Sequence, residues 1–272
     1  MGIFEGVLLV SDMDGTLLDE NEKVSEENIR AIEYFKAEGG IFTLASGRNA
    51  INMDKAIDFA EPNAPIVADN GSLIFDHKSG KCLQKYLLGD EVIPAVLEIE
   101  KAFPSSSIEI YTPDNFYACK FHETVKRPEY FLKSAIFGMH FTDIPCPWSK
   151  VVFMQTPEES TIMREYVEKR PFFNDFNVIR ADKYFVEILH KSASKGGCLP
   201  YIKSLFKNIY LTVSAGDNEN DLTMISDADI GYATENAAPI LKAAADRIAP
   251  HHNNSAIASI IRDIEKQVRE RK

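Results

Sequence analysis

The feature that most constrains the fold is a short run, residues 7–10, that is apolar at every position. A strand with one face in water alternates apolar and polar residues, whereas a strand covered on both faces does not. Strands covered on both faces are typical of parallel sheets. Similar runs occur at residues 41–45, 65–68 and 209–213. We therefore expect an α/β fold with a doubly wound, Rossmann-like parallel sheet.

A predicted helix between the first two runs completes a strand–helix–strand unit. Ser25 is a suitable N-cap, Glu26 and Glu27 suit the positive end of a helix, and Gly39 ends the pattern. Such a unit implies a right-handed crossover between parallel strands. A second amphipathic helix closes the chain, with apolar residues at Ile257, Ile260, Ile261, Ile264 and Val268.

The middle of the chain has a different pattern. Strand-like runs occur at residues 107–111, 116–121, 150–154 and 184–188. The first two flank a turn, which indicates an antiparallel hairpin, and a helical stretch covers about residues 158–168. We therefore expect an α+β cap domain, residues 84–189, that selects the substrate. It is inserted into an α/β core made of residues 1–83 and 190–272.

Composition excludes several classes of protein. The net charge is −11, which disfavours binding to nucleic acid phosphates. The four cysteines show no C-x-x-C spacing, and no apolar run approaches the roughly 20 residues of a membrane span. The first residues lack the pattern of a signal peptide. We expect a cytoplasmic protein, a monomer or weak homodimer, that binds neither nucleic acid nor membranes.

Two carboxylates follow the first apolar strand directly, in the string Asp12-Met13-Asp14-Gly15-Thr16. Open α/β sheets place their active sites at the carboxyl ends of their strands. A polar loop with a capping aspartate would explain a bare D-x-D. The longer D-x-D-G-T-L string after a buried strand favours a catalytic site.

A second acidic pair, Asp217 and Asp221, follows the run at residues 209–213. Asp is also common in the first turn of a helix, so this pair alone is ambiguous. Together with Asp12 these side chains offer the hard oxygen ligands that Mg²⁺ prefers. The sequence therefore favours a magnesium site.

Two further elements suit an anion. Ser46 and Gly47 follow the second strand, where a hydroxyl and backbone N–H groups make either an anion pocket or a simple N-cap. Lys195 stands at a predicted helix start, where a cation opposes the helix dipole. A bound phosphate would remove that conflict.

These four elements, in this order, resemble the haloacid dehalogenase superfamily, and most closely its Cof-type phosphatases with a C2-type α/β cap. The resemblance implies that Asp12 is the nucleophile and that Asp14 is the general acid and then the base. It implies a phosphoryl pocket of Met13, Ser46, Gly47, Lys195 and Asn220. It places Arg48 and Asn70 in loops that face the substrate. It assigns Mg²⁺ to Asp12, Asp14 (through its backbone carbonyl), Asp217 and Asp221.

The sequence departs from this pattern at two places. Pro200 falls inside the helix expected to begin at Lys195, so we expect a kink there. Glu235 stands where relatives usually carry glycine, before Asn236 and Ala237, which makes the local turn uncertain. In the cap, contact of His122, Lys126 or Arg127 with the substrate is a lesser alternative to plain exposed charge.

We therefore expect an Mg²⁺-dependent phosphatase that acts on a small phosphorylated metabolite, either a sugar phosphate or a phosphorylated cofactor. Two alternatives stay open. One is a phosphosugar mutase resembling phosphomannomutase, which returns the phosphoryl group to the sugar. The other is a metabolite-binding regulator without turnover.

Overall fold

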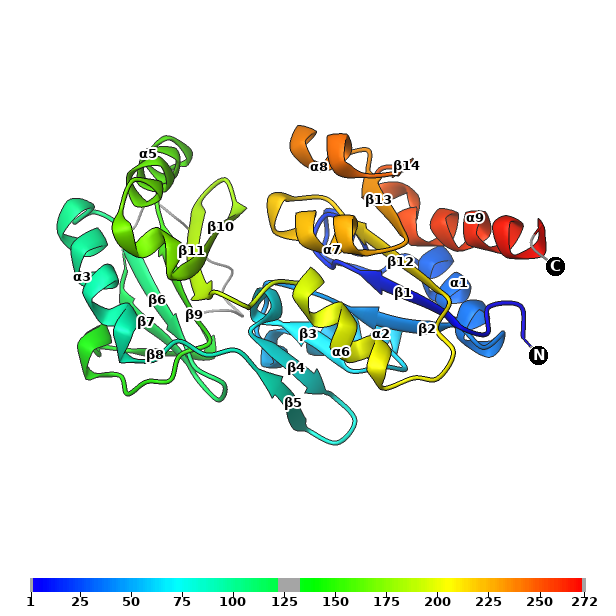
Figure 1. Cartoon of the computed structure of the whole chain (residues 1–272), viewed down its shortest axis with the longest axis horizontal. Coiled ribbons are helices and arrows are strands. Elements are labelled where there is room, and N and C mark those ends of the chain that lie inside the picture. The colour runs from blue at the N-terminus through cyan, green and yellow to red at the C-terminus, as the bar shows by residue number, and fades with distance from the viewer. Residues whose placement is uncertain (1, 122–132, 271–272) are drawn as a thin grey trace. The chain divides into compact units, whose positions relative to one another are not determined.

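A computed structural model describes residues 2–121 and 133–270, which form two compact units (Figure 1). The first unit combines Met1–Gln84 with Ser194–Lys272, and the second is Lys85–Ala193. The chain thus leaves the first unit once and returns to it. Within the described residues, no helix combines the length and apolar character that a bilayer span requires.

The first unit is built on a five-stranded sheet in the order β14-β13-β12-β1-β2, in which every neighbouring pair is parallel. Its strands are β1 (Val7–Ser11), β2 (Ile41–Leu44), β12 (Leu211–Gly216), β13 (Ile230–Thr234) and β14 (Arg247–Ala249). Every residue of β1 is buried. The α/β class predicted from these apolar runs is confirmed. The run at residues 209–213 was placed slightly too early, because β12 begins at Leu211 and continues to Gly216.

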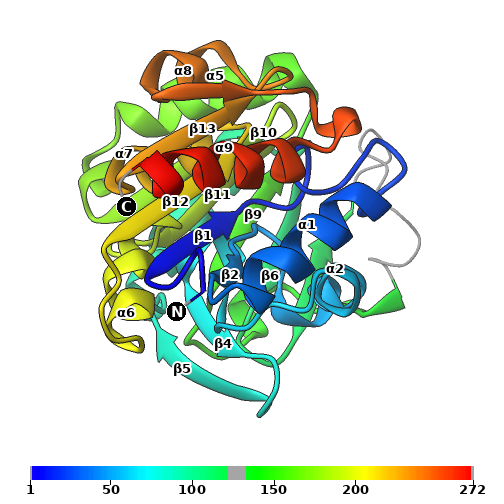
Figure 2. The ribbon, with the colours of Figure 1, turned by 90° about the vertical axis from the view of Figure 1, so that its right-hand side faces the viewer.

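The first unit also contains α-helices. They are α1 (Glu26–Ala37), α2 (Asp54–Ala60), α6 (Leu199–Ser204), α7 (Leu222–Asp227), α8 (Pro239–Ala244) and α9 (Ala256–Glu270). Leu8 and Val10 of β1 share a core cluster with Ile202 of α6 and Met224 of α7. Helices α1 and α9 lie side by side (Figure 2).

The predicted cap of α1 and the predicted apolar stripe of α9 are confirmed. Ser25 Oγ accepts a hydrogen bond from the backbone N–H of Asn28 over 3.2 Å, which caps α1. The apolar stripe of α9 is buried as expected, at Ile257, Ile260, Ile261, Ile264 and Val268.

A small three-stranded sheet, ordered β3-β4-β5, also belongs to the first unit. Its strands are β3 (Ile66–Ala68), β4 (Leu73–Asp76) and β5 (Lys81–Lys85). The run at residues 65–68 was expected to join the parallel sheet. Instead β3 pairs antiparallel with β4, and a single bridge from Ala45 to Val67 links it to the end of β2. Neither β4 nor β5 was predicted from the sequence.

The second unit is an antiparallel-rich sheet in the order β10-β11-β9-β6-β7-β8. Its strands are β6 (Ser107–Tyr111), β7 (Phe116–Lys120), β8 (Ala135–Phe137), β9 (Lys150–Met154), β10 (Phe176–Asp182) and β11 (Phe185–His190). The predicted hairpin is β6–β7. Helices α3 (Ile93–Ala102) and α5 (Pro157–Glu168) share one core with Ile108, Ile110 and Val151. Of these elements, the sequence analysis missed α3, β8 and β10.

Candidate active site

The acidic motifs meet because their strands are parallel neighbours. Residue Ser11, the last of β1, pairs with Ala215 of β12, and the backbone N–H of Asp12 donates to the carbonyl of Ala215 over 2.9 Å. Strands β1 and β12 both end at this edge of the sheet. Asp12 and Asp217 therefore begin neighbouring loops at the carboxyl end of the sheet, where such folds bind ligands.

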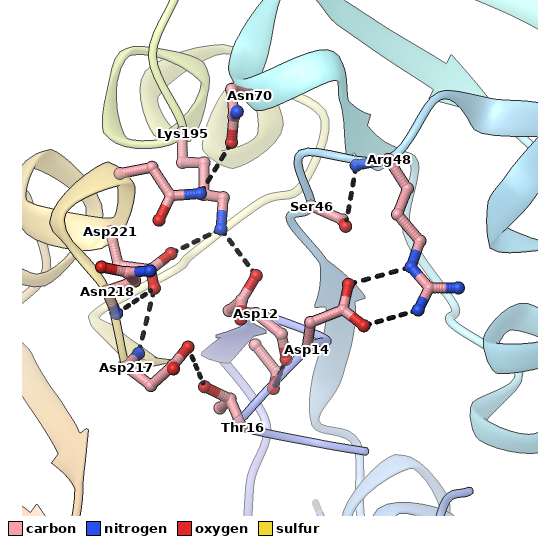
Figure 3. A network of polar contacts seen from close by, with 12 residues as sticks. Asp12, Asp14, Thr16, Ser46, Arg48, Asn70, Lys195, Asp217, Asn218 and Asp221 are labelled. Atoms are coloured by element: carbon pink, nitrogen blue, oxygen red, sulfur yellow. Dashed lines mark hydrogen bonds and ion pairs between the residues drawn. The ribbon is translucent and has the colours of Figure 1, made fainter. Parts of the chain in front are cut away.

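A buried ion-pair cluster lies at this edge. Lys195 Nζ is 2.6 Å from Oδ1 of Asp12 and 2.6 Å from Oδ1 of Asp221. The three side chains are 1%, 6% and 0% exposed, respectively. Figure 3 shows the lysine pointing between the two carboxylates. The carboxylates of Asp12 and Asp221 therefore compensate the charge of the buried Lys195 ammonium.

Lys195 does not begin an α-helix, contrary to expectation. It precedes a short 3₁₀ turn, Gly196–Cys198, and α6 begins only at Leu199. Pro200 then lies in the first turn of α6, where its missing N–H breaks no helical hydrogen bond. The expected kink at Pro200 is therefore wrong.

The cluster shifts the pKa values of its members. Burial and the negative charge of Asp221 raise the pKa of Asp12 well above its usual value, and Lys195 only partly opposes them. Burial and Asp221 likewise raise the pKa of Asp217 to about 7. Burial alone would lower the pKa of Lys195, but Asp12 and Asp221 outweigh it and raise that pKa. A buried site of this kind has an excess of negative charge.

The donor set fits a divalent cation. Asp12, Asp217 and Asp221 each offer a carboxylate oxygen, and these atoms lie within 4.8 Å of one another. Three carboxylates and one ammonium leave two negative charges uncompensated, which a divalent cation would neutralise. Carboxylate oxygens are the ligands that Mg²⁺ prefers, usually with retained waters. A bound cation would also lower the raised pKa values, because it favours the ionised carboxylates.

Asp221 also shapes the loop that carries Asp217. Its Oδ2 accepts hydrogen bonds from the backbone N–H groups of Asp217 (3.0 Å) and Asn218 (3.1 Å). Gly216 must lack a side chain, since a Cβ there would lie 2.6 Å from Cβ of Asp221. An ionised carboxylate has about four lone-pair sites, so Asp221 retains capacity for a metal or a metal-bound water.

The predicted phosphate residues form a connected group beside this cluster. The backbone N–H of Asn70 donates to the carbonyl of Ser46, and Asn220 Nδ2 donates to Asn70 Oδ1, both over 2.9 Å. Gly47 faces the Asn70 amide closely, because a Cβ at Gly47 would lie 3.0 Å from Asn70 Nδ2. Ser46 Oγ accepts a hydrogen bond from the backbone N–H of Arg48 over 3.1 Å, which leaves its O–H able to donate.

The two aspartates of the first motif point apart. Figure 3 shows Asp12 directed toward Lys195 and Asp14 directed toward Arg48. Arg48 Nε lies 2.9 Å from Oδ2 of Asp14, and Nη2 lies 2.5 Å from Oδ1. Arg48 was expected only in a loop facing the substrate, and this bidentate ion pair was not foreseen.

Sequence reasoning also missed contacts that hold the first motif in place. Thr16 Oγ1 donates to Oδ1 of Asp217 over 3.4 Å, and Asn236 Nδ2 donates to the carbonyl of Gly15 over 2.8 Å. Thr16 lies in the D-x-D-G-T-L motif and Asn236 follows Glu235, but the sequence assigned no role to either side chain. Glu235 is not among the described residues with positive φ, so its turn does not require glycine.

Four candidate residues from the sequence analysis remain, namely Met13 of the phosphoryl pocket and three residues of the cap. Met13 is buried, and its carbonyl accepts the N–H groups of Leu17 and Leu18 over 3.0 and 2.9 Å. His122, Lys126 and Arg127 lie outside the described residues.

Comparison with known proteins identifies the class that this fold and site define. The family model for haloacid dehalogenase-like hydrolases matches residues 9–261. The chain therefore belongs to that family, and the predicted resemblance to its Cof-type members is confirmed.

Individual relatives agree with this assignment. "Putative phosphatase YxeH" of Bacillus subtilis is 27% identical over 94% of this chain and 97% of its own length. The 5-amino-6-(5-phospho-D-ribitylamino)uracil phosphatase YcsE of the same organism is 25% identical over 94% of each chain. A haloacid dehalogenase-like hydrolase from Bacteroides thetaiotaomicron is 25% identical, with a TM-score of 0.77 over 96% of this chain and 99% of that one. The subclass IIB sugar phosphatase BT4131 has the same fold, with a TM-score of 0.81 over 94% and 98% of the two chains at 22% identity.

Proposed function

We propose that this enzyme hydrolyses the phosphate monoester of a small metabolite through an aspartyl-phosphate on Asp12, with Mg²⁺ as its metal. The observation that carries the proposal is the buried cluster in which Lys195 lies 2.6 Å from both Asp12 and Asp221. A structural ion pair needs one carboxylate per lysine. A cluster with Asp217 as a third carboxylate keeps an excess of negative charge, which costs stability unless a ligand uses it.

In the first step, an oxygen of Asp12 attacks phosphorus while the bond from phosphorus to the ester oxygen breaks. Lys195 keeps its charge beside the attacking carboxylate and stabilises the equatorial phosphoryl oxygens. Ser46 donates its O–H to one of those oxygens. Asp14 gives its proton to the departing oxygen, so an alcohol leaves.

In the second step, water attacks the phosphorus of the aspartyl-phosphate and passes its proton to Asp14. The bond to Asp12 breaks, inorganic phosphate leaves, and both aspartates return to their starting states. Mg²⁺ held by Asp12, Asp217 and Asp221, with the carbonyl of Asp14, would neutralise phosphoryl charge throughout.

The second unit supplies the residues that select the leaving group, in this proposal. Sugar phosphates are the leading substrate class, supported by the sugar phosphatase among the fold relatives. A phosphorylated cofactor or its precursor is the other class, since YcsE is named for a ribityl phosphate.

A screen of phosphorylated metabolites with Mg²⁺ tests the proposal, with Asp12→Asn as the blank. We expect phosphate release from sugar phosphates that is absent in the variant and abolished by EDTA. Release that persists in excess EDTA, or no release from any substrate, would overturn it. Stimulation by a sugar bisphosphate, with isomerisation much faster than release, would instead identify a mutase.

A further inference from the structure

The side chain of Arg48 contacts Asp14, the proposed acid–base residue. Its guanidinium makes two hydrogen bonds to Asp14, over 2.9 and 2.5 Å, each from a different nitrogen to a different oxygen. Glu22 is a more distant carboxylate, 3.6 Å from Nη2. The two-point contact fixes both the position and the plane of the Asp14 carboxylate, which a single contact would not do.

The two partners differ in how firmly they are held. The Arg48 side chain is only 15% exposed, whereas the Asp14 side chain is 51% exposed. The backbone of Arg48 is tied at both ends, because its N–H donates to Ser46 Oγ and its carbonyl accepts the N–H of Asp69 over 2.9 Å. Among the described residues, Arg48 donates both of the hydrogen bonds that the side chain of Asp14 accepts. The arginine is less exposed and is held through its backbone, so it is the more fixed partner, and the exposed carboxylate is the one that it orients.

We propose that Arg48 is a positioning residue for Asp14, and that its two-point contact restricts the carboxyl group to one orientation for its acid–base role. This inference rests on the proposed function and deepens it. An exposed Asp14 without Arg48 would sample several rotamers, and proton transfer requires a heavy-atom distance of about 2.6–3.2 Å. Because the backbone N–H of Arg48 also donates to Ser46 Oγ, Arg48 connects Ser46 of the proposed phosphoryl pocket with Asp14.

The test compares the rate of phosphoenzyme formation in wild type and Arg48→Ala for two substrates. An alkyl phosphate needs protonation of its leaving oxygen, whereas p-nitrophenyl phosphate needs little. For Arg48→Ala we expect a loss of about 10²-fold with the alkyl phosphate, the size typical of a misplaced group. With p-nitrophenyl phosphate the first step should change little. Arg48→Lys keeps the charge but not the two-point contact, so it should recover only part of the loss.

A double-mutant cycle separates positioning from other roles. If Arg48 acts through Asp14, then Arg48→Ala in an Asp14→Asn background should cost almost nothing further. Equal losses with both substrates, a change confined to KM, or full additivity with Asp14→Asn would overturn the inference.

Two controls complete the design. Arg30→Ala removes an exposed arginine that pairs with Glu26 on α1, and it should leave both rates unchanged. An unfolding temperature of Arg48→Ala within a few degrees of the wild-type value would show that the variant folds. If Arg48→Ala does not fold, the rates of Arg48→Lys are compared with wild type instead. A wild-type enzyme that forms no phosphoenzyme would refute the proposed function itself, which is a different result from any of those above.

Discussion

Lys195 Nζ lies 2.6 Å from Oδ1 of Asp12, although 183 residues separate them in the chain. Both side chains are almost fully buried, so this pair is protected from the screening that weakens surface ion pairs. The ammonium sits beside the atom that we propose attacks phosphorus. We propose that this contact both holds the buried cluster together and orients the nucleophile, and measurements of stability and of activity test the two roles separately.

The two aspartates of the first motif should differ in the intermediate that they allow. With p-nitrophenyl phosphate, Asp14→Asn should still phosphorylate Asp12 and then stall, because it lacks the base for the second step. Acid quench should trap more phosphoenzyme in Asp14→Asn than in wild type, and none in Asp12→Asn. Loss of acid–base assistance should slow turnover by about 10²–10⁴-fold. Equal trapping in the two variants would exclude Asp12 as the nucleophile.

Replacement of Lys195 should reduce stability as well as activity. Lys195→Met leaves the buried carboxylates of Asp12 and Asp221 without their cation, and breaking a buried pair in this way costs about 3–5 kcal/mol. Urea unfolding without metal measures the loss. Lys207→Met removes the same charge from an exposed position and should change stability by less than about 0.5 kcal/mol. Similar losses in both variants would contradict the structural importance of the cluster.

Stability of the metal-free protein should depend on pH through Asp217. Burial and the charge of Asp221 raise the pKa of Asp217 from its ordinary value of 3.8 to about 7 in the folded protein. Between these values the folded state keeps a proton that the unfolded state has released, so this contribution to stability falls as pH rises from about 4 to 7. The stabilising contribution of Asp217 is fully present below its pKa in the unfolded state and is lost above its pKa in the folded state.

Asp217→Asn supplies the control for this pH effect. In EDTA, the free energy of unfolding of wild type relative to the variant should decrease across that pH window. At pH 8, added Mg²⁺ should stabilise wild type more than Asp217→Asn, because only wild type keeps the Asp217 carboxylate as a metal ligand. Parallel stability curves for the two proteins would show that Asp217 does not titrate in this range.

Gly15 should be required for the metal site rather than for the backbone alone. Gly15 and Gly80 both have positive φ, +78° and +68°, so alanine strains both by about 1–2 kcal/mol. A Cβ at Gly15 would also lie 2.4 Å from Oδ2 of Asp217, whereas one at Gly80 meets nothing within 4 Å. We expect Gly15→Ala, but not Gly80→Ala, to raise the Mg²⁺ concentration needed for half-maximal activity. An equal rise in both would assign the effect to backbone strain.

The sequence by itself determined the parallel sheet and the edge where its motifs gather. Apolar runs such as residues 7–10 specify strands buried on both faces, and parallel strands carry their following loops to one edge. That reasoning was sufficient to bring Asp12 and Asp217 together, because it needs only local pattern and strand direction. It failed for residues 65–68, because an apolar run does not specify its partner, and β3 pairs with a hairpin strand instead.

Only the tertiary structure decided which side chains pair at that edge. Lys195 contacts the carboxylates of Asp12 and Asp221, and Arg48 contacts the carboxylate of Asp14, and none of these pairs was predicted from the sequence. These pairings join residues 26 to 183 positions apart. They depend on strand order, rotamers and the position of a short 3₁₀ turn, each set by packing across the whole first unit. No local pattern encodes such distances, so the ion pairs that shape the site appear only once the chain has folded.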